Sequence, residues 1–291
     1  MPVATKGPSP GAARTVLITG VSSGIGRVTS ELMSRRGWSV AATSRDPAAL
    51  RTWASELNVT VFQLDVTDER SIAGVVAAVV DRFGAIDVLV NNAGDGVFGP
   101  LEGATAEQIE LQFRTTVLGP LLLIRQVMPV MRSRRAGTIV NVSSIGGRMA
   151  APFASLYHAS KFAIEGFSEA FRYEAALHGI RVKLVEPAHF KTGFMTRSLQ
   201  ITAHGDYEAQ LRNYMEWVLK EDEAAPGPLP VAVAILRAAE DPSARLRYPV
   251  KGAFILALTS LLPDAVFRSL PGAGMTRRPK KPAGTSTSIG G

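Results

Sequence analysis

The chain has 291 residues, of which 46% are hydrophobic and 20% are charged. This composition is typical of a globular protein and excludes a collagen, a coiled coil or long disorder for the bulk of the chain. The sequence contains no cysteine, which excludes disulfides, thiolate metal sites and a cysteine nucleophile. The histidines never fall at the spacing of metal ligands, so we predict no metal site from His158, His178, His189 and His204.

The net charge of +7 is concentrated near the two ends of the sequence. Residues 1–14 and 271–291 hold six basic residues and no acidic residue, which leaves +1 for residues 15–270. A body without excess positive charge argues against nucleic-acid binding. Both ends are rich in Gly, Pro, Ser and Thr, so we predict disordered basic tails. The basic run at 277–281 could contact an anionic membrane, but a few basic residues bind weakly, and we favour a solubilising role.

No signal peptide or membrane span is predicted. The first basic residue is not followed by the apolar run of a signal peptide, and no apolar run approaches the roughly 20 residues that cross a bilayer. Together with the absence of cysteine, this leads us to expect a cytoplasmic protein.

Strands and helices alternate along residues 15–250. In the first half we predict strands at 15–19, 38–43, 59–64 and 86–90, and helices at 25–36, 47–56 and 68–83. In the second half we predict helices at 106–134, 155–177 and 230–240, and strands at 138–142, 180–185 and 246–250. This alternation indicates βαβ units. The expected fold is a single α/β domain over residues 15–270, doubly wound (Rossmann-type), with a largely parallel seven-stranded sheet and helices on both faces.

Residues 190–227 lack the alternation of strands and are predicted to be mostly helical, forming a lid over a substrate. Their apolar side chains suit such a lid, although they would suit ordinary packing of these helices equally well. They are Phe194, Met195, Leu199, Ile201, Tyr207, Tyr214, Met215, Trp217 and Val218.

A glycine-rich turn follows the first strand, in the sequence Thr-Gly-Val-Ser-Ser-Gly-Ile-Gly at 19–26. Glycines between a strand and a helix permit a tight turn and let the backbone approach a pyrophosphate closely. The helix that follows offers free N–H groups to anionic oxygens. A bound dinucleotide is therefore favoured over an ordinary tight loop.

The end of the second strand selects between NAD and NADP. An acidic residue there binds the ribose 2′-OH of NAD, whereas an arginine accommodates the 2′-phosphate of NADP. The sequence places Ser44 and Arg45 at this point, followed by Asp46. Asp46 could serve NAD or simply cap the helix that begins at Pro47. Because a guanidinium can grip a phosphate with two hydrogen bonds, we favour NADP(H) as the cofactor.

Tyr157 and Lys161 lie four residues apart at the start of a predicted helix, so they share one face. A nearby ammonium stabilises a phenolate, so we expect Lys161 to lower the pKa of Tyr157. That would make Tyr157 a usable general acid or base. Such pairs also occur by chance, and this one alone does not identify a site.

Together these motifs resemble the short-chain dehydrogenase/reductase family over about residues 15–250. The glycine turn is accompanied by Asp65 after the third strand, by Asn-Asn-Ala-Gly at 91–94, and by Ser144 thirteen residues before Tyr157. Pro187 and Thr192 follow the sixth strand. Within the family, the chain resembles the shorter oxidoreductases, including hydroxysteroid and retinol dehydrogenases.

The resemblance implies a role for each matching residue. Tyr157 would donate a proton to a carbonyl, Lys161 would lower its pKa and bind the nicotinamide ribose, and Ser144 would polarise the carbonyl. Asp65 would contact the adenine, Asn91 and Gly94 would line the cofactor cleft, and Pro187 and Thr192 would hold the carboxamide. The full set implied for the cofactor is Gly20, Ser22, Ser23, Gly24, Ile25, Gly26, Ser44, Arg45, Asp65, Val66, Asn91, Ala93, Gly94, Tyr157, Lys161, Pro187 and Thr192.

Two positions depart from the family pattern. Thr116 aligns with an asparagine whose backbone carbonyl holds a water that relays protons to the lysine and whose side chain props a local helix distortion. A backbone carbonyl survives the substitution, so Thr116 is kept in the predicted catalytic set. Ala188 stands where the family has glycine, and it limits the freedom of the backbone beside the nicotinamide pocket.

The predicted function is the NADP-dependent interconversion of a lipophilic alcohol and its ketone or aldehyde. The alternative is an NADP-binding sensor or scaffold whose catalysis has decayed, motivated by Thr116 and Ala188. His189, beside the nicotinamide-facing segment, could touch the substrate, whereas His158 is expected to be structural. We also predict a homodimer or homotetramer formed through helix 106–134 and the helix of Tyr157. The apolar residues that could form this interface, or could instead face the sheet, are Leu118, Leu121, Leu122, Val127 and Met131.

Overall fold

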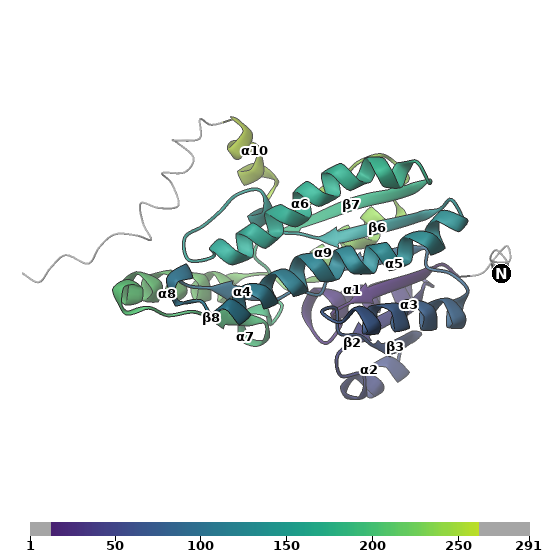
Figure 1. The fold of residues 1–291 in the computed structure, drawn as a ribbon, viewed down its shortest axis with the longest axis horizontal. Coiled ribbons are helices and arrows are strands. Elements are labelled where there is room, and N and C mark those ends of the chain that lie inside the picture. The colour runs from purple at the N-terminus through teal and green to yellow at the C-terminus, as the bar shows by residue number, and fades with distance from the viewer. Residues whose placement is uncertain (1–12, 262–291) are drawn as a thin grey trace, which may run out of the picture.

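Seven parallel strands form the centre of the molecule in the order β3-β2-β1-β4-β6-β7-β9 (Figure 1). The computed structural model describes residues 13–261, with side chains to residue 258. The strands are β1 (Thr15–Thr19), β2 (Ser39–Ser44), β3 (Val59–Gln63), β4 (Val88–Asn91), β6 (Gly137–Val142), β7 (Ile180–Pro187) and β9 (Arg247–Val250). The chain winds outward from β1 to β3 and then from β4 to β9. The predicted doubly wound sheet is thereby confirmed, with its switch point between β1 and β4.

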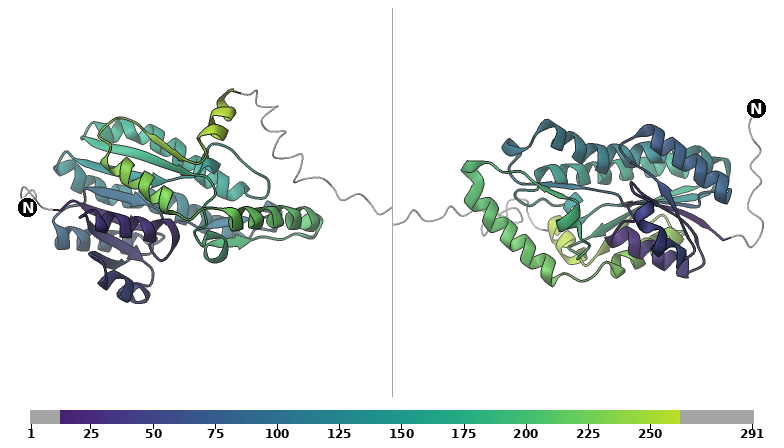
Figure 2. Two further views of the ribbon diagram at one scale, coloured as in Figure 1. Left: turned by 180° about the vertical axis from the view of Figure 1, so that it is seen from behind. Right: turned by 90° about the horizontal axis from the view of Figure 1, so that it is seen from below.

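Helices cover both faces of this sheet (Figure 2). One face packs against α1 (Gly24–Arg35), α2 (Arg51–Ser55) and α9 (Leu229–Glu240). The other face packs against α3 (Glu69–Phe83), α5 (Gly119–Ser133) and α6 (Ser155–Ala176). Successive side chains of a strand point to opposite faces, and accordingly Val16 and Ile18 join the first core while Leu17 joins the second.

The predicted helix 106–134 is interrupted. It consists of α4 (Ala106–Phe113), a π-helical turn at Arg114–Leu118 and α5. Gly119 directly follows the π turn, where a Cβ atom would lie 2.7 Å from the carbonyl oxygen of Val66. The helix therefore passes close to the loop after β3 at the point where it is distorted.

Residues 190–227 contain two helices, as expected, and one short strand that was not predicted. The elements are α7 (Phe194–Arg197), β8 (Leu199–Ile201) and α8 (Glu208–Ala224). The strand pairs in parallel with β5 (Gly96–Phe98), a partner about 100 residues earlier in the chain. Figure 1 shows this segment beyond the carboxyl ends of the central strands.

Three-residue 3₁₀ turns and a last helix complete the described chain. The turns are Ala48–Leu50, Leu101–Gly103, Ile145–Gly147 and Gly205–Tyr207, and the helix is α10 (Ala253–Leu261). No helix within residues 13–261 is long and apolar enough to cross a membrane.

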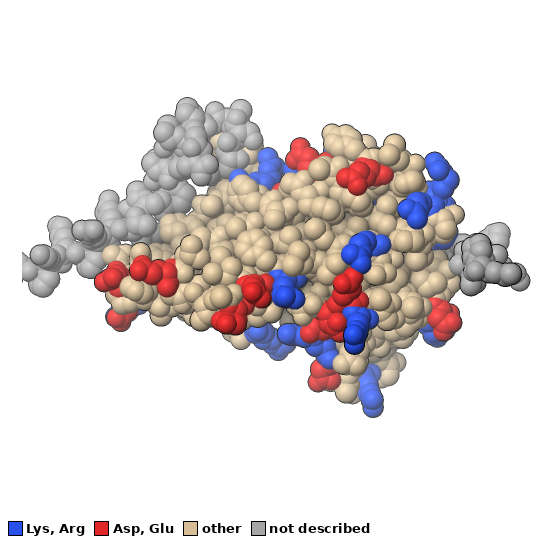
Figure 3. All heavy atoms as spheres, viewed as in Figure 1, with Lys and Arg blue, Asp and Glu red and all other residues tan. Residues whose placement is uncertain are grey.

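The predicted tails lie outside the described residues, except for residues 13 and 14. Arg14, which we assigned to the disordered N-terminal tail, forms an ion pair with Glu240 at 3.1 Å and stacks over Trp38. The ordered domain thus begins at least one residue before β1. Figure 3 shows acidic and basic side chains interspersed on the face that it displays.

Candidate active site

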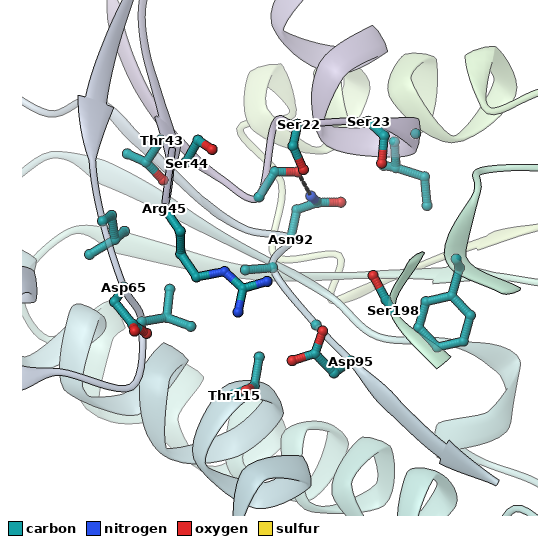
Figure 4. A pocket seen from close by; sticks show the side chains of 18 of the residues that line it. Ser22, Ser23, Thr43, Ser44, Arg45, Asp65, Asn92, Asp95, Thr115 and Ser198 are labelled. Carbon is teal, nitrogen blue, oxygen red and sulfur yellow. Dashed lines mark hydrogen bonds between the residues drawn. The ribbon is translucent and has the colours of Figure 1, made fainter. Parts of the chain in front are cut away.

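A cavity of about 440 Å³ lies at the carboxyl ends of β1 to β4. Its walls come from the turn after β1, the end of β2 and the loops after β3 and β4 (Figure 4). We call it the larger cavity. Its lining includes most of the residues predicted to bind the cofactor, namely Gly20, Ser22, Ser23, Gly24, Ile25, Ser44, Arg45, Asp65, Val66, Ala93, Gly94 and Thr192.

The glycine turn shapes one wall of the larger cavity. Gly20 and Gly24 have φ values of +72° and +59°, which L-residues with a side chain rarely adopt. A Cβ atom on Gly26 would lie 2.4 Å from the carbonyl oxygen of Gly20, so Gly26 lets α1 pack against the turn rather than lining the cavity. Ser23 precedes α1 without capping it through its side chain, so the first N–H groups of the helix remain available to an anionic ligand.

Arg45 projects from the end of β2 into the larger cavity. Figure 4 shows its guanidinium between the side chains of Asp65 and Asp95. The neighbouring Asp46 accepts hydrogen bonds from the backbone N–H groups of Ala48, at 3.0 Å, and Ala49, at 3.3 Å. Its carboxylate therefore caps the turn before α2. Asp46 also lines the cavity, so its capping of this turn does not exclude a contact with the cofactor.

Asn91 was expected to line the cofactor cleft, and the structure places it elsewhere. It is buried at the end of β4, where its Nδ2 atom donates to the Oδ1 atom of Asn141 on β6 at 2.8 Å. Asn92 takes the predicted place and lines the cavity, donating to the carbonyl oxygens of Thr19 and Gly20. Asn91 is the last residue of β4 and Asn92 is the first residue after it, and their side chains point into different surroundings.

A second cavity, of about 320 Å³, adjoins the first. Six residues line both cavities, namely Ile25, Asn92, Gly94, Asp95, Thr192 and Phe194. We call it the apolar cavity, because the 190–227 segment contributes mainly apolar walls, from Phe190, Phe194, Met195, Tyr214, Trp217 and Val218. Among the other residues expected in that segment's apolar set, Ile201 is exposed on the surface and Tyr207 partly so. The opposite wall holds Ser144, Tyr157, Lys161 and Pro187, so the structure brings these predicted residues together.

The environment of Tyr157 differs from the one expected. Its ring packs edge-on against Phe98, with centroids 5.5 Å apart. Burial raises the pKa of Tyr157 above its usual value, and a hydrogen bond with Ser144 opposes that rise. The Oγ atom of Ser144 also accepts from the backbone N–H of Gly146 at 3.0 Å.

The ammonium of Lys161 lies near Tyr157 and is held by a backbone carbonyl. Its Nζ atom donates to the carbonyl oxygen of Val142 at 3.0 Å and lies 5.9 Å from the centre of the Tyr157 ring. Burial lowers the pKa of Lys161 to about 8, while the charge of Glu165 opposes this. The expected lowering of the Tyr157 pKa by Lys161 is therefore wrong for this structure, because burial raises that pKa and the group that opposes the rise is Ser144. At neutral pH the tyrosine keeps its proton.

Thr116 is buried in the π turn and lines neither cavity, whereas Thr115 lines the larger one. The Oγ1 atom of Thr116 accepts a hydrogen bond from Nε2 of Gln112 at 3.1 Å. Gln112 has no exposed surface, and it belongs to no motif that would have distinguished it in the sequence. Its amide is the contact that the sequence analysis missed.

Ala188 is accommodated without a strained backbone. Positive φ values outside glycine occur, among the described residues, at Arg135, Phe153 and Lys251. The N–H of Ala188 donates to the carbonyl oxygen of Val250 on β9 at 3.0 Å. The family glycine is thus not required here for its conformational freedom.

The two histidines near the apolar cavity have different surroundings. His158 lies between the backbone carbonyl of Gly146, 2.8 Å from Nδ1, and the N–H of Ala151, 3.0 Å from Nε2. This pair of partners fits a neutral ring with its proton on Nδ1, and burial lowers the pKa of His158. His189 contacts Asp222 of α8 at 3.0 Å on the cavity wall.

Known proteins share this architecture. A 3-ketodihydrosphingosine reductase of Bacteroides thetaiotaomicron is 36% identical over 255 residues, covering 86% of this chain and 93% of the relative. Retinol dehydrogenase 8 of Bos taurus is 39% identical over 205 residues, covering 67% and 65%. The solved structure of an actinorhodin polyketide ketoreductase variant with NADPH has a TM-score of 0.69 and 26% identity, covering 82% and 95%.

The model of the short chain dehydrogenase family matches residues 14–202, a span that includes the glycine turn, Ser144, Tyr157 and Lys161. The relatives, the sheet order and this match agree, and the chain belongs to the short-chain dehydrogenase/reductase family of oxidoreductases.

Proposed function

We propose that the chain is an NADP-dependent oxidoreductase that interconverts a lipophilic ketone or aldehyde and the corresponding alcohol. The observation that carries this proposal is the meeting of Ser144, Tyr157 and Lys161 on the wall of an apolar cavity, beside a larger cavity with the walls of a dinucleotide site.

The larger cavity fits a dinucleotide in shape and in its donors. The turn at 20–26 and the start of α1 would hold the pyrophosphate, and Asp65 with Val66 would flank the adenine. Arg45 would grip the 2′-phosphate that distinguishes NADP from NAD. When bound, the nicotinamide supplies the hydride, while the protein supplies binding, orientation and the proton.

The catalytic residues act on the carbonyl oxygen of the substrate. Tyr157, which is protonated at neutral pH, would donate its phenolic proton to that oxygen as hydride arrives at carbon. The Oγ atom of Ser144, already hydrogen-bonded to Tyr157, would orient the carbonyl. Lys161, held on the Val142 carbonyl, would present its ammonium to the ribose and to the proton supply.

The apolar cavity supports a lipophilic substrate, because burial of apolar surface is the main driving force available there. The names of two relatives are in keeping with this, since they refer to 3-ketodihydrosphingosine and to retinol. A screen that follows NADPH consumption, with ketones and aldehydes graded from small to steroid-sized, tests the proposal. Turnover that rises with apolar size supports it.

The alternative is an NADP-binding sensor or scaffold. Its motivation, the threonine at 116 and the alanine at 188, is weakened by a π turn that forms with threonine and by an unstrained backbone at Ala188. Tight NADPH binding without turnover of any compound in the screen would favour the sensor and reject the enzyme.

Arg45→Ala tests the choice of cofactor. Loss of a charge-assisted phosphate contact should weaken NADPH binding by about 1.5–3 kcal/mol and leave NADH binding nearly unchanged. Fluorescence titration measures both affinities, with Arg51→Ala on the neighbouring α2 as the control. Equal losses for the two cofactors would show that Arg45 does not read the phosphate.

A further inference from the structure

Gln112 is a fully buried amide in the last turn of α4, outside both cavities. We infer that Gln112 is a positioning residue, which holds the Tyr157–Lys161 turn of α6 in register with the loop between β4 and β5 that walls both cavities. This inference rests on the proposed function, because its consequence is a change in the rate of hydride transfer.

The amide of Gln112 is bonded on every side. Its Oε1 atom accepts from the N–H of Val97 on β5 at 2.8 Å. Its Nε2 atom lies 3.0 Å from the carbonyl oxygen of Asp95, 3.1 Å from Oγ1 of Thr116 and 3.2 Å from Oγ of Ser160. A primary amide has two N–H donors for these three oxygens, so one donor is shared between two of them, while the amide oxygen accepts the Val97 bond; an apolar side chain of similar size can neither donate nor accept.

One arm of this network reaches the catalytic turn. Ser160 is fully buried on α6, directly before Lys161, and its Oγ atom donates to the backbone carbonyl of Tyr157 at 2.7 Å. Hydrogen bonds therefore run without interruption from Gln112 through Ser160 to the backbone that carries the Tyr157 side chain.

The other arms reach the walls of the two cavities. Asp95 lines both cavities, and its backbone carbonyl oxygen accepts a hydrogen bond from Nε2 of Gln112. A Cβ atom on Gly94 would lie 3.9 Å from Oγ1 of Thr116 and 4.0 Å from Nζ of Lys161, so the loop, the π turn and the lysine meet at one place. Gln112 hydrogen-bonds the loop and the π turn directly, and it reaches the helix of the lysine through Ser160. Hydrogen bonds of this kind fix the relative positions of these parts more strictly than apolar packing does.

The placement of Tyr157 relative to the cofactor wall determines how well the proton donor and the hydride meet at one carbonyl. A displacement of about 1 Å in such a geometry can cost on the order of 100-fold in rate. Loss of Gln112 should therefore lower kcat more than it alters substrate or cofactor binding.

The experiment compares Gln112→Leu and Ser160→Ala with Gln108→Leu. Gln108 is the other glutamine of α4, and its side-chain amide accepts from the backbone N–H of Thr105 at the helix start and donates to Gln200. The probes are NADPH, NADPH deuterated at the transferred position, and methyl nonyl ketone or the ketone that the wild-type chain reduces fastest. The readouts are kcat per NADPH-binding site, the deuterium isotope effect on kcat, the Kd of NADPH and the unfolding midpoint.

We expect Gln112→Leu to lower kcat per binding site about 10- to 100-fold, with a larger isotope effect and an NADPH Kd within about twofold. Ser160→Ala should change the same quantities in the same direction but less, and it carries the test if Gln112→Leu does not fold. An unchanged kcat per site, or an equal loss in Gln108→Leu, would overturn the inference.

A wild-type chain that reduces no compound would defeat the proposed function without deciding this point. In that case backbone amide exchange over residues 155–161 decides it. Faster exchange in Gln112→Leu than in Gln108→Leu supports positioning, and equal exchange rejects it.

Discussion

At the scale of single residues, Tyr157 is the group on which the mechanism depends. Its pKa lies above the usual value because burial disfavours the phenolate more than Ser144 favours it. A tyrosine that keeps its proton suits carbonyl reduction, in which the proton is given away. The opposite direction, alcohol oxidation, needs the phenolate and should gain rate at alkaline pH.

Tyr157→Phe should abolish most turnover while leaving NADPH affinity unchanged. The substitution removes only the transferable proton, and general acid catalysis contributes about 10²–10⁴-fold. Steady-state kinetics and fluorescence titration measure the two quantities, with Tyr173→Phe, an exposed tyrosine of the same helix, as the control. Wild-type turnover in Tyr157→Phe would show that the site is misassigned.

Thr116→Asn should leave turnover within a few fold of the wild-type rate. The π turn at 114–118 forms with threonine in place, and Gln112 already sets an amide against its side chain. The backbone carbonyl of residue 116 is unaffected by the substitution. Steady-state kcat checks this, and a marked gain in rate would mean that the asparagine side chain is needed to shape the turn.

At the scale of elements, periodicity predicted the regular structure but not its interruptions. The strand at 15–19 and the helix at 68–83 were found nearly to the residue, because buried runs, Asp68 and Gly84 mark their limits. Periodicity did not reveal the π turn, because a single five-residue turn is too short to change the apolar pattern of a long helix, and only the family resemblance at Thr116 pointed to a distortion there. The strand β8 was missed because three residues have too little pattern, and its partner β5 is distant in sequence.

The candidate site was predictable wherever a motif fixes a residue in relation to a strand end. Arg45 follows β2 and Asp65 follows β3, and both line the larger cavity. Tyr157 was identified instead by its spacing from Lys161 on a helix, and it lines the apolar cavity. Asn91 and Asn92 both belong to the motif, and only the direction of each side chain at the end of β4 distinguishes them. The burial that raises the Tyr157 pKa depends on Phe98 and the 190–227 segment, which spacing along the chain does not reveal.

The buried end of β7 should make stability depend on pH. Glu186 has no exposed surface, and burial first, then the charge of Glu165, raises its pKa to about 7, against the opposing Arg148 and Arg247. The folded chain thus binds this proton more tightly than the unfolded chain. The stability that the proton contributes is complete below the unfolded pKa of 4.5 and is lost as the pH rises through about 7.

Glu186→Gln should remove this dependence. Relative to wild type, the variant should gain up to about 3 kcal/mol of unfolding free energy between mildly acidic and mildly alkaline pH. Urea unfolding at the two extremes measures the change. Glu169→Gln is the control, and its effect on the unfolding free energy should change with pH in the opposite direction, because Arg247 lowers the pKa of that exposed carboxyl. A constant difference between Glu186→Gln and wild type across the range would contradict the prediction.

At the scale of the whole molecule, the sheet order explains why one edge holds both cavities. The carboxyl ends of β1 and β4 part at the switch point, which leaves room for the larger cavity between their loops. Figure 1 shows the 190–227 segment beyond that edge. Tyr214 and Val218 of its helix α8 are buried in one cluster with Phe98 and line the apolar cavity. In the proposed function, the phosphates and adenine of the cofactor would thus lie in one half of this edge and the reacting carbonyl in the other.

The same arrangement leaves α5 and α6 as the outer layer of one face, and we propose that this layer is where two copies of the chain associate. Val127 and Met131 of the predicted interface are fully buried in the core beneath it, so they face the sheet. Leu118 is 48% exposed, and Phe162 and Tyr173 of α6 are also exposed. Large apolar side chains gathered on one face are typical of a protein interface.

We therefore expect a homodimer or homotetramer at micromolar concentration, and Phe162→Asp combined with Leu118→Asp should shift it toward single chains. A charge placed in an apolar interface costs several kcal/mol on association unless it is paired. Sedimentation equilibrium gives the mass of each variant. The matched control is Leu229→Asp, an equally exposed leucine at the start of α9 on the opposite face of the sheet, which should leave the mass unchanged. A wild-type mass of one chain would reject the assembly, and a mass unaffected by the paired α5–α6 substitutions would move the interface to another face.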